Sequence, residues 1–158
     1  MGKRANFDAY WDEGWPDIEW LKKFFLAPKG QQWSFRGGND NWGLSAEGVE
    51  GTEHFGPTDA RRITIHLSMW GHPELGVLLI YQKTGGKYAQ AYSSRGDLSR
   101  LREHVRTLQN DPMPIGLFIP FEKAWVAVKE FIETDGELPK GIDWIENKKL
   151  PPGTFPPP

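Results

Sequence analysis

Apolar and polar residues alternate along the middle of the chain. In RRITIHLSMW, an isoleucine, leucine or methionine occupies every second position from Ile63 to Met69, which is typical of a strand with one buried face. The apolar run LGVLLIYQK predicts a central strand covered on both sides. YAQAYSS follows the turn sequence TGGK and predicts a third strand. Residues 62–93 are therefore predicted to form a three-stranded antiparallel meander.

Two other stretches have helical periodicity. The first follows Asp17, whose carboxylate can cap the first turn, and it ends at Pro28. The second begins at Pro120 or Phe121 and ends at Gly136. Apolar side chains recur along one side of this second helix at Phe121, Ala124, Trp125, Val128, Phe131 and Ile132. Both segments are predicted to be amphipathic helices that pack on the sheet.

The remaining segments give weaker patterns. Residues 37–59 are rich in Gly, Asn, Asp and Glu, and they predict a long loop or a weak hairpin around Trp42. Residues 98–119 fit either helical turns or a hairpin; we favour a hairpin around NDPMP, because its prolines exclude a helix there. After Gly136, IDWIE predicts a short strand that covers one end of the core.

These elements predict an α+β fold. We expect an antiparallel sheet of about five or six strands, with an N-terminal helix and a C-terminal amphipathic helix packed on it. The length of 158 residues favours a single domain, residues 1–150, followed by a Pro-rich tail at 151–158.

Composition excludes several classes of protein. The chain has 19 basic and 21 acidic residues, a net charge of −2, which argues against a nucleic-acid binder that acts through its own basic field. Without cysteine it has no disulfide and no thiolate metal site, and it is not itself a zinc nucleobase deaminase. No segment approaches the ~18–20 apolar residues of a membrane span. We expect a soluble cytoplasmic protein that does not bind a membrane.

The search for catalytic chemistry gives only weak candidates. His66 and His72, with Glu74 nearby, do not match a zinc-binding pattern, so we expect neither a metal nor a cofactor. Ser94 lies at a strand end but lacks the G-x-S-x-G context of a nucleophile. A small hydrolase that uses His66, His72 or Ser94 remains an alternative interpretation, and a non-enzymatic adaptor module is another.

The C-terminal half of the chain resembles immunity protein family one of bacterial polymorphic toxin systems. The similar segments are GVLLIYQKTGGKYAQAYSSRG and PMPIGLFIPFEKAWVAVKEFIETDGELPKGIDWIE, within residues 60–146. The matching features are the strand ending in Tyr81, the strand ending in Ser94-Arg95-Gly96, the hairpin leading to Pro120, the helix with Ala124 and Phe131, and the closing Gly136-x-x-Pro139 and Trp144.

This resemblance implies a protein that is encoded beside a toxin and neutralises it by tight binding. The toxins of the family are often nucleic-acid deaminases, in which case any zinc is held by the toxin. The family has no catalytic residues to transfer to this chain. We therefore expect a bacterial immunity protein, not an enzyme, that occludes the active-site cleft of its cognate toxin and does not contact nucleic acid itself. Its oligomeric state is left open.

Aromatic residues that lie among carboxylates are typical of protein-recognition surfaces. We expect the toxin-binding residues to come from the long loop (Asp40, Trp42, Glu47), from the rim where a strand meets a turn (Trp70, His72, Glu74) and from a neighbouring strand end (Tyr92, Arg95). Trp42 and Trp70 are the expected anchors. Arg95 is expected to pair with a toxin carboxylate or, within the chain, with Asp97 or Glu103.

Overall fold

The computed structural model describes residues 1–157 apart from 8–9, 13 and 34–40, and for residues 10–12 it describes only the backbone. Eight antiparallel strands form the main sheet. They are β1 (Gly2–Phe7), β2 (Tyr10–Asp12), β3 (Asn41–Glu47), β4 (Thr64–His72), β5 (Gly76–Gly85), β6 (Tyr88–Ser94), β9 (Phe118–Ile119) and β10 (Trp144–Glu146). The order is β10-β6-β5-β4-β3-β1-β2, and β9 pairs with one end of β5.

Helices and short elements complete the fold. The helices are α1 (Ile18–Leu26) and α2 (Phe121–Glu133); a separate hairpin consists of β7 (His104–Arg106) and β8 (Pro112–Pro114); and the 3-10 turns are η1 (Leu98–Arg100), η2 (Ile115–Leu117) and η3 (Asn147–Lys149). The predicted α+β class is confirmed, as are both helices and the meander, which is β4-β5-β6.

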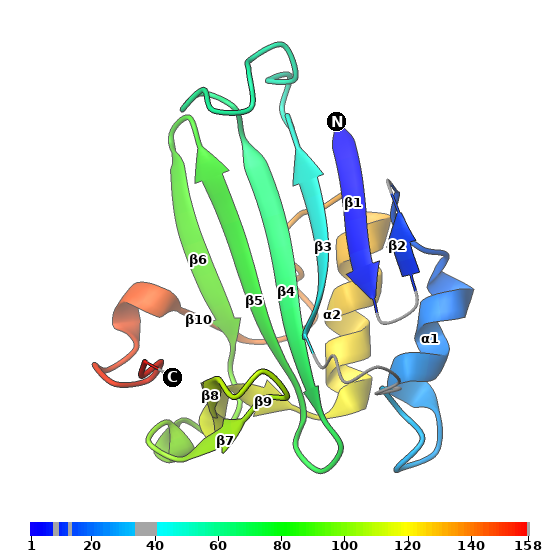
Figure 1. The fold of residues 1–158 in the computed structure, drawn as a ribbon, viewed down its shortest axis with the longest axis vertical. Helices are drawn as coiled ribbons and strands as arrows, with labels where there is room; N and C mark the ends of the chain where they lie inside the picture. The colour runs from blue at the N-terminus through cyan, green and yellow to red at the C-terminus, as the bar shows by residue number, and fades with distance from the viewer. Residues whose placement is uncertain (8–9, 13, 34–40, 158) are drawn as a thin grey trace.

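Both helices pack on the same side of the sheet, called the helix side here. Alternate strand residues such as Leu67, Leu79 and Tyr81 join Leu21 and Phe131 of the helices in the main buried cluster. In Figure 1, α2 lies behind the sheet and α1 beside its β1–β2 end. Among the described residues, the opposite side is covered at its lower end, where η1, β8, η2 and β9 contribute to a second, smaller buried cluster.

The sheet contains more strands than the five or six that we expected. β1 inserts between β3 and β2, and its apolar side chains Ala5 and Phe7 are buried on the helix side. β3 replaces part of the predicted loop, and there Trp42, Leu44 and Ala46 alternate toward the core. A hairpin forms within 98–119 as β7–β8, but β8 (Pro112–Pro114) lies inside NDPMP, where the turn was expected. The residues after it form η2 and β9, which pairs with β5.

The end of α2 is fixed to the sheet by a buried tyrosine. The Gly136 N–H donates to the carbonyl of Phe131 (2.8 Å) and ends the helix. The Tyr81 hydroxyl on β5 donates to the carbonyl of Gly136 (2.8 Å). The following residues, Ile142 and Trp144, pack against the main cluster, as expected for a segment that covers one end of the core.

Tyr81 should give the stability an alkaline pH dependence. Burial raises its pKa from 10.0 to about 12, so the folded state favours the neutral phenol. The resulting stabilisation is complete below pH 10 and is lost as the pH rises toward 12. In urea unfolding, Tyr81→Phe should lose about 1 kcal/mol at pH 7, and its free energy of unfolding should fall less steeply than that of the wild type between pH 10 and 12. If the free energies of unfolding of the two proteins fell equally steeply with pH, the alkaline pH dependence would not come from Tyr81.

Candidate binding surface

The predicted contact residues do not form one surface. Trp70 and His72 lie at the end of β4, and Glu74 lies in the turn that follows it. Glu47 lies at the other end of the sheet, because it pairs with Thr64 at the start of β4. Asp40 lies outside the described residues. Only the group at the β4–β5 turn is brought together as predicted.

Trp42 is buried, so the prediction that it lies exposed on a loop is wrong. Its side chain is 1% exposed, and its ring stacks on Trp33 with centroids 3.8 Å apart. Phe7 and Phe24 contact it at 5.0 and 5.1 Å. The physical reason is the alternation of β3, which directs Trp42 to the helix side with Leu44. Trp42 is a core residue and is not available as an exposed anchor.

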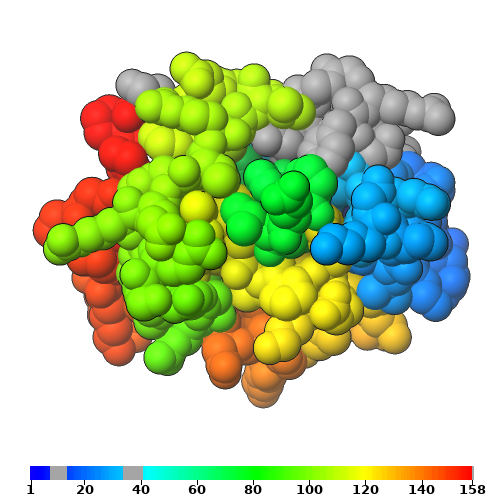
Figure 2. Space-filling view, turned by 90° about the horizontal axis from the view of Figure 1, so that it is seen from below, coloured from blue at the N-terminus to red at the C-terminus, as the bar shows by residue number. Residues whose placement is uncertain are grey.

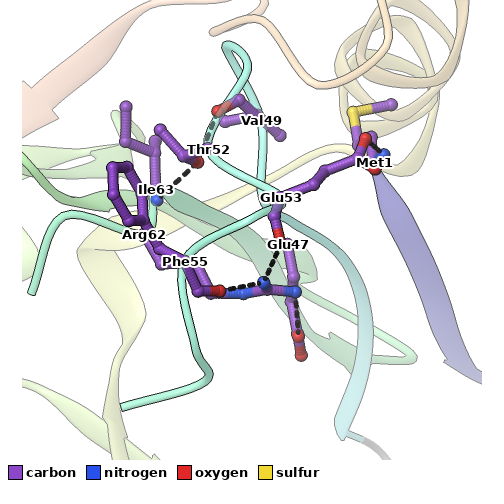
Figure 3. Close-up of polar contacts among 8 residues, drawn as sticks. All are labelled: Met1, Glu47, Val49, Thr52, Glu53, Phe55, Arg62 and Ile63. Carbon is purple, nitrogen blue, oxygen red and sulfur yellow. Dashed lines mark hydrogen bonds and ion pairs between the residues drawn. The ribbon is translucent and has the colours of Figure 1, made fainter. Parts of the chain in front are cut away.

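Glu47 helps to hold the loop between β3 and β4. Figure 3 shows the Arg62 guanidinium donating to the carbonyls of Glu53 (3.0 Å) and Phe55 (2.8 Å) and, more weakly, to the Glu47 carboxylate (3.4 Å). Nearby, the Thr52 hydroxyl donates to the carbonyl of Val49 and accepts from the N–H of Ile63. These contacts fix the loop at the upper end of the sheet.

The carboxylates of this loop are neutralised within the chain. They form the ion pairs Glu47–Arg62, Glu50–Lys83, Glu53–Met1 N-terminus and Asp59–Arg61. The Arg61 hydrogen bonds lower the pKa of Asp59 to about 2, and hydrogen bonding to Lys83 lowers the pKa of Glu50. Because each negative charge has a nearby cation, this loop is a weaker candidate for binding a basic partner than its acidic sequence suggests.

Tyr92 and Arg95 are separated from the β4–β5 turn. Tyr92 pairs with Tyr81 and packs against the main cluster on the helix side. The predicted partners of Arg95 within the chain are engaged elsewhere: Asp97 accepts from Ser99 and Glu103 pairs with Arg100. These alternatives for Arg95 are therefore wrong, and the exposed Arg95 side chain has no ion-pair partner among the described residues.

A groove of about 310 Å³ opens beside the β4–β5 turn. It is lined by Lys29, Gln32, Pro73, Glu74, Leu75, Gly76, Pro120, Phe121 and Glu122, and we call it the rim groove. Figure 2 shows the turn between the beginning of α2 and the segment that follows α1. His72 shapes the turn, because its Nδ1 accepts from the N–H groups of Glu74 and Leu75, each at 3.2 Å. Within the described part of the chain, the carboxylates of Glu74 and Glu122 have no ion-pair partner.

Above the second cluster, the side of the sheet opposite the helices is uncovered by the described residues (Figure 1). We call it the open face, and it comprises Ser45, Thr64, His66, Ser68, Gln82 and Ala91, with Trp70 half-buried at its lower end. Its side chains are mostly small or polar. This surface as a whole was not predicted from the sequence, although the polar positions of RRITIHLSMW, Thr64, His66 and Ser68, indicate a solvent-facing side of the strand.

The geometry does not support the hydrolase alternative. Ser94 is fully buried, and its hydroxyl accepts from the N–H of Leu79 (2.9 Å) and donates to the carbonyl of Leu117 (2.7 Å). His66 and His72 lie on the same strand, six residues or about 20 Å apart. No group of three potential metal ligands occurs in the chain as described. The hydroxyl of Ser94 joins β5, β6 and η2, which is a structural role.

Removing this hydroxyl should destabilise the fold. Ser94→Ala leaves a buried N–H and a buried carbonyl without their partner, so the free energy of unfolding should fall by about 1–3 kcal/mol in urea unfolding. Ser93→Ala is the matched control. Ser93 is also buried, but its hydroxyl donates a single hydrogen bond, to the Asn147 side chain (2.6 Å), so its removal leaves no backbone group without a partner and should cost less. Equal losses in the two variants would contradict the structural role of Ser94.

Comparisons with known proteins identify the family. In the described residues, neither helix has the length and apolarity needed to cross a membrane. No curated protein and no solved structure matches the chain. The model of the family described as immunity protein Imm1 matches residues 49–146, more than half of the chain, and this range contains β4, β5, β6 and α2. The expected resemblance is thus confirmed: the chain belongs to the Imm1 family of immunity proteins.

Proposed function

We propose that this immunity protein neutralises its cognate toxin by binding directly over the active-site cleft. The observation that carries the proposal is the open face, a sheet surface left uncovered by the described residues in a fold whose other side is packed by helices. Standard protein interfaces cover about 800 Å² per partner, so we expect the toxin to contact both the β4–β5 turn and the exposed strands. The family supports binding in place of catalysis.

We further propose that the toxin is a nucleic-acid deaminase that acts in the bacterial cytoplasm and holds its own zinc ion. The family resemblance supports this class of toxin. A cleft that binds nucleic acid needs cationic side chains for the phosphates. Glu74 and Glu122 line the rim groove together with Lys29. Neither carboxylate forms an ion pair in the described part of the chain, so both are suited to contact such a cleft.

Within this surface, Trp70 is the proposed anchor. His72 holds the turn in shape, Glu74 faces basic groups of the toxin, and Arg95 pairs with a toxin carboxylate. Asp40, which lies outside the described residues, stays a predicted toxin contact. We also propose that residues 1–150 form one domain, with the segment from 151 on as its tail. The Thr154 carbonyl lies 3.0 Å from Nε2 of His104, which supports a tail packed on the domain.

Co-expression tests the proposed function. The chain is produced together with the toxin domain encoded beside it, and cell survival and co-purification are measured. We expect survival together with a stable complex. Survival without any complex would contradict direct binding and would favour an enzyme that repairs damage or modifies the toxin. Death of the cells despite full expression of the chain would contradict immunity toward that toxin.

A further inference from the structure

The outer edge of β6 is paired over only part of its length. On its inner side, β6 pairs with β5 from Tyr88 to Ser93. On its outer side, β10 pairs only with Tyr92, Ser93 and Ser94. Residues 88–91 therefore have no strand on their outer side among the described residues. Figure 1 shows this free edge of β6 above β10.

The direction of the backbone groups follows from two hydrogen bonds at the lower end of β6. The N–H of Leu79 on β5 is bonded to the Ser94 hydroxyl, whereas the N–H of Arg95 donates outward to the carbonyl of Asp143, just before β10 (3.1 Å). Because backbone groups alternate in direction along a strand, odd-numbered residues of β6 point outward. The N–H and C=O groups of Ala89 and Ala91 therefore point away from β5.

This edge lacks the features that normally prevent strand pairing. Natural edges are protected by charged residues, proline or bulges, whereas residues 88–91 read Tyr-Ala-Gln-Ala. Ala89 and Ala91 direct their small side chains to the open face, in register with Thr84 and Gln82. Another backbone can thus approach β6 without displacing a large side chain.

We propose that an extended segment of the toxin adds to β6 as a further strand, pairing with Ala89 and Ala91. This inference rests on the proposed function, because it places a strand of the same toxin beside the open face that the toxin covers. Backbone hydrogen bonds supply affinity in this mode of recognition, and neighbouring side chains supply specificity. The added strand would continue the sheet on the line of β10.

A second copy of the chain fits this edge poorly. If two β6 strands paired antiparallel, the β10 of each copy would obstruct the hairpin of the other, because β10 already occupies the outer side at residues 92–94. Only residues 89–91 of each copy would be left to pair. Such a contact falls well short of the roughly 800 Å² per partner that a stable dimer buries. A toxin bound on the open face would bury most of its interface area there and would need only a small additional contact at the edge. We therefore assign the edge to the toxin.

Amide hydrogen exchange on the wild-type complex tests the proposal without any substitution. The probe is the toxin domain encoded beside the chain. The Ala89 and Ala91 amides should exchange roughly 10-fold more slowly or better in the complex than in the free chain. Unchanged exchange at both amides would overturn strand addition. Protection that grows with the concentration of the chain alone would assign the edge to a second copy and would also overturn it.

A matched pair of variants tests the backbone directly. Ala91→Pro removes the outward N–H, which β6 does not use within the chain, and Ala91→Ser retains it. With both variants shown to be folded by circular dichroism, the proline should bind the toxin roughly 10-fold or more weakly than the serine, which carries any effect of the altered side chain on the open face. Wild-type affinity in Ala91→Pro would contradict strand addition and leave the proposed function intact. A wild-type chain that does not bind the toxin would contradict the proposed function instead.

Discussion

Gly85→Ala is expected to lower the free energy of unfolding by about 3 kcal/mol, because it combines backbone strain with overpacking. Gly85, at the end of β5, has φ +100°, a conformation that residues with a side chain rarely adopt. A β-carbon there would overlap the carbonyl oxygen of Arg62. This backbone contact cannot be relieved by rotating a side chain, so the β5 end or the segment leading into β4 must shift.

Gly86→Ala is the matched control for this prediction. Gly86 also has positive φ, +56°, but the nearest atom to an added β-carbon is Cγ1 of Ile63 at 3.5 Å, an ordinary contact. The free energy of unfolding of Gly86→Ala should fall by only about 1 kcal/mol, from backbone strain alone. Urea unfolding of both variants measures the difference. If the two variants lost the same free energy of unfolding, the close contact between Gly85 and the Arg62 carbonyl would not be the cause of the larger expected effect.

Trp70→Ala is expected to weaken toxin binding by about 2–4 kcal/mol, or roughly 30- to 1,000-fold in Kd, if Trp70 is the anchor of the interface. The side chain is half-buried between the open face and the second cluster. Truncation removes a large aromatic surface close to the turn that carries Glu74. Isothermal titration calorimetry with the toxin domain measures the change, and thermal unfolding shows whether the variant is folded.

Val126→Ala provides the control for lost apolar area. Val126 is 46% exposed on α2, on the helix side of the sheet. Its truncation should change the binding free energy by less than about 0.5 kcal/mol. A folded Trp70→Ala variant that binds like the wild type would contradict the anchor. A large effect of Val126→Ala would place the toxin on the helix side of the molecule.

Much of the fold was predictable because its strongest patterns are local. The apolar alternation that includes Ile63 and Ile65 extends over several residues, and the helical repeat that includes Phe131 extends over several turns. Both β4 and α2 could therefore be predicted from the sequence. β1 has only two buried apolar side chains beside charged ones, and β3 lies among Gly, Asn and Ser. Their place in the sheet depends on pairing between distant segments, which periodicity does not encode.

The binding surface was less predictable for the same reason. The turn with Trp70 to Glu74 was identified because a strand end and turn residues are visible in the sequence. The orientation of Trp42 depends on the side of β3 that meets α1, through Phe24. The free edge of β6 exists because β10, about 50 residues further along the chain, pairs with only its last three residues.

Stoichiometric inhibition of the purified toxin tests the central claim most directly. The residual activity of a fixed amount of toxin domain on its substrate is measured against increasing amounts of this chain. We predict that activity falls linearly and vanishes at one chain per toxin, and that a large excess of substrate slows the onset of inhibition, since both compete for the cleft. Inactivation of many toxin molecules by one chain, or full inhibition of a toxin that still binds substrate, would contradict the account.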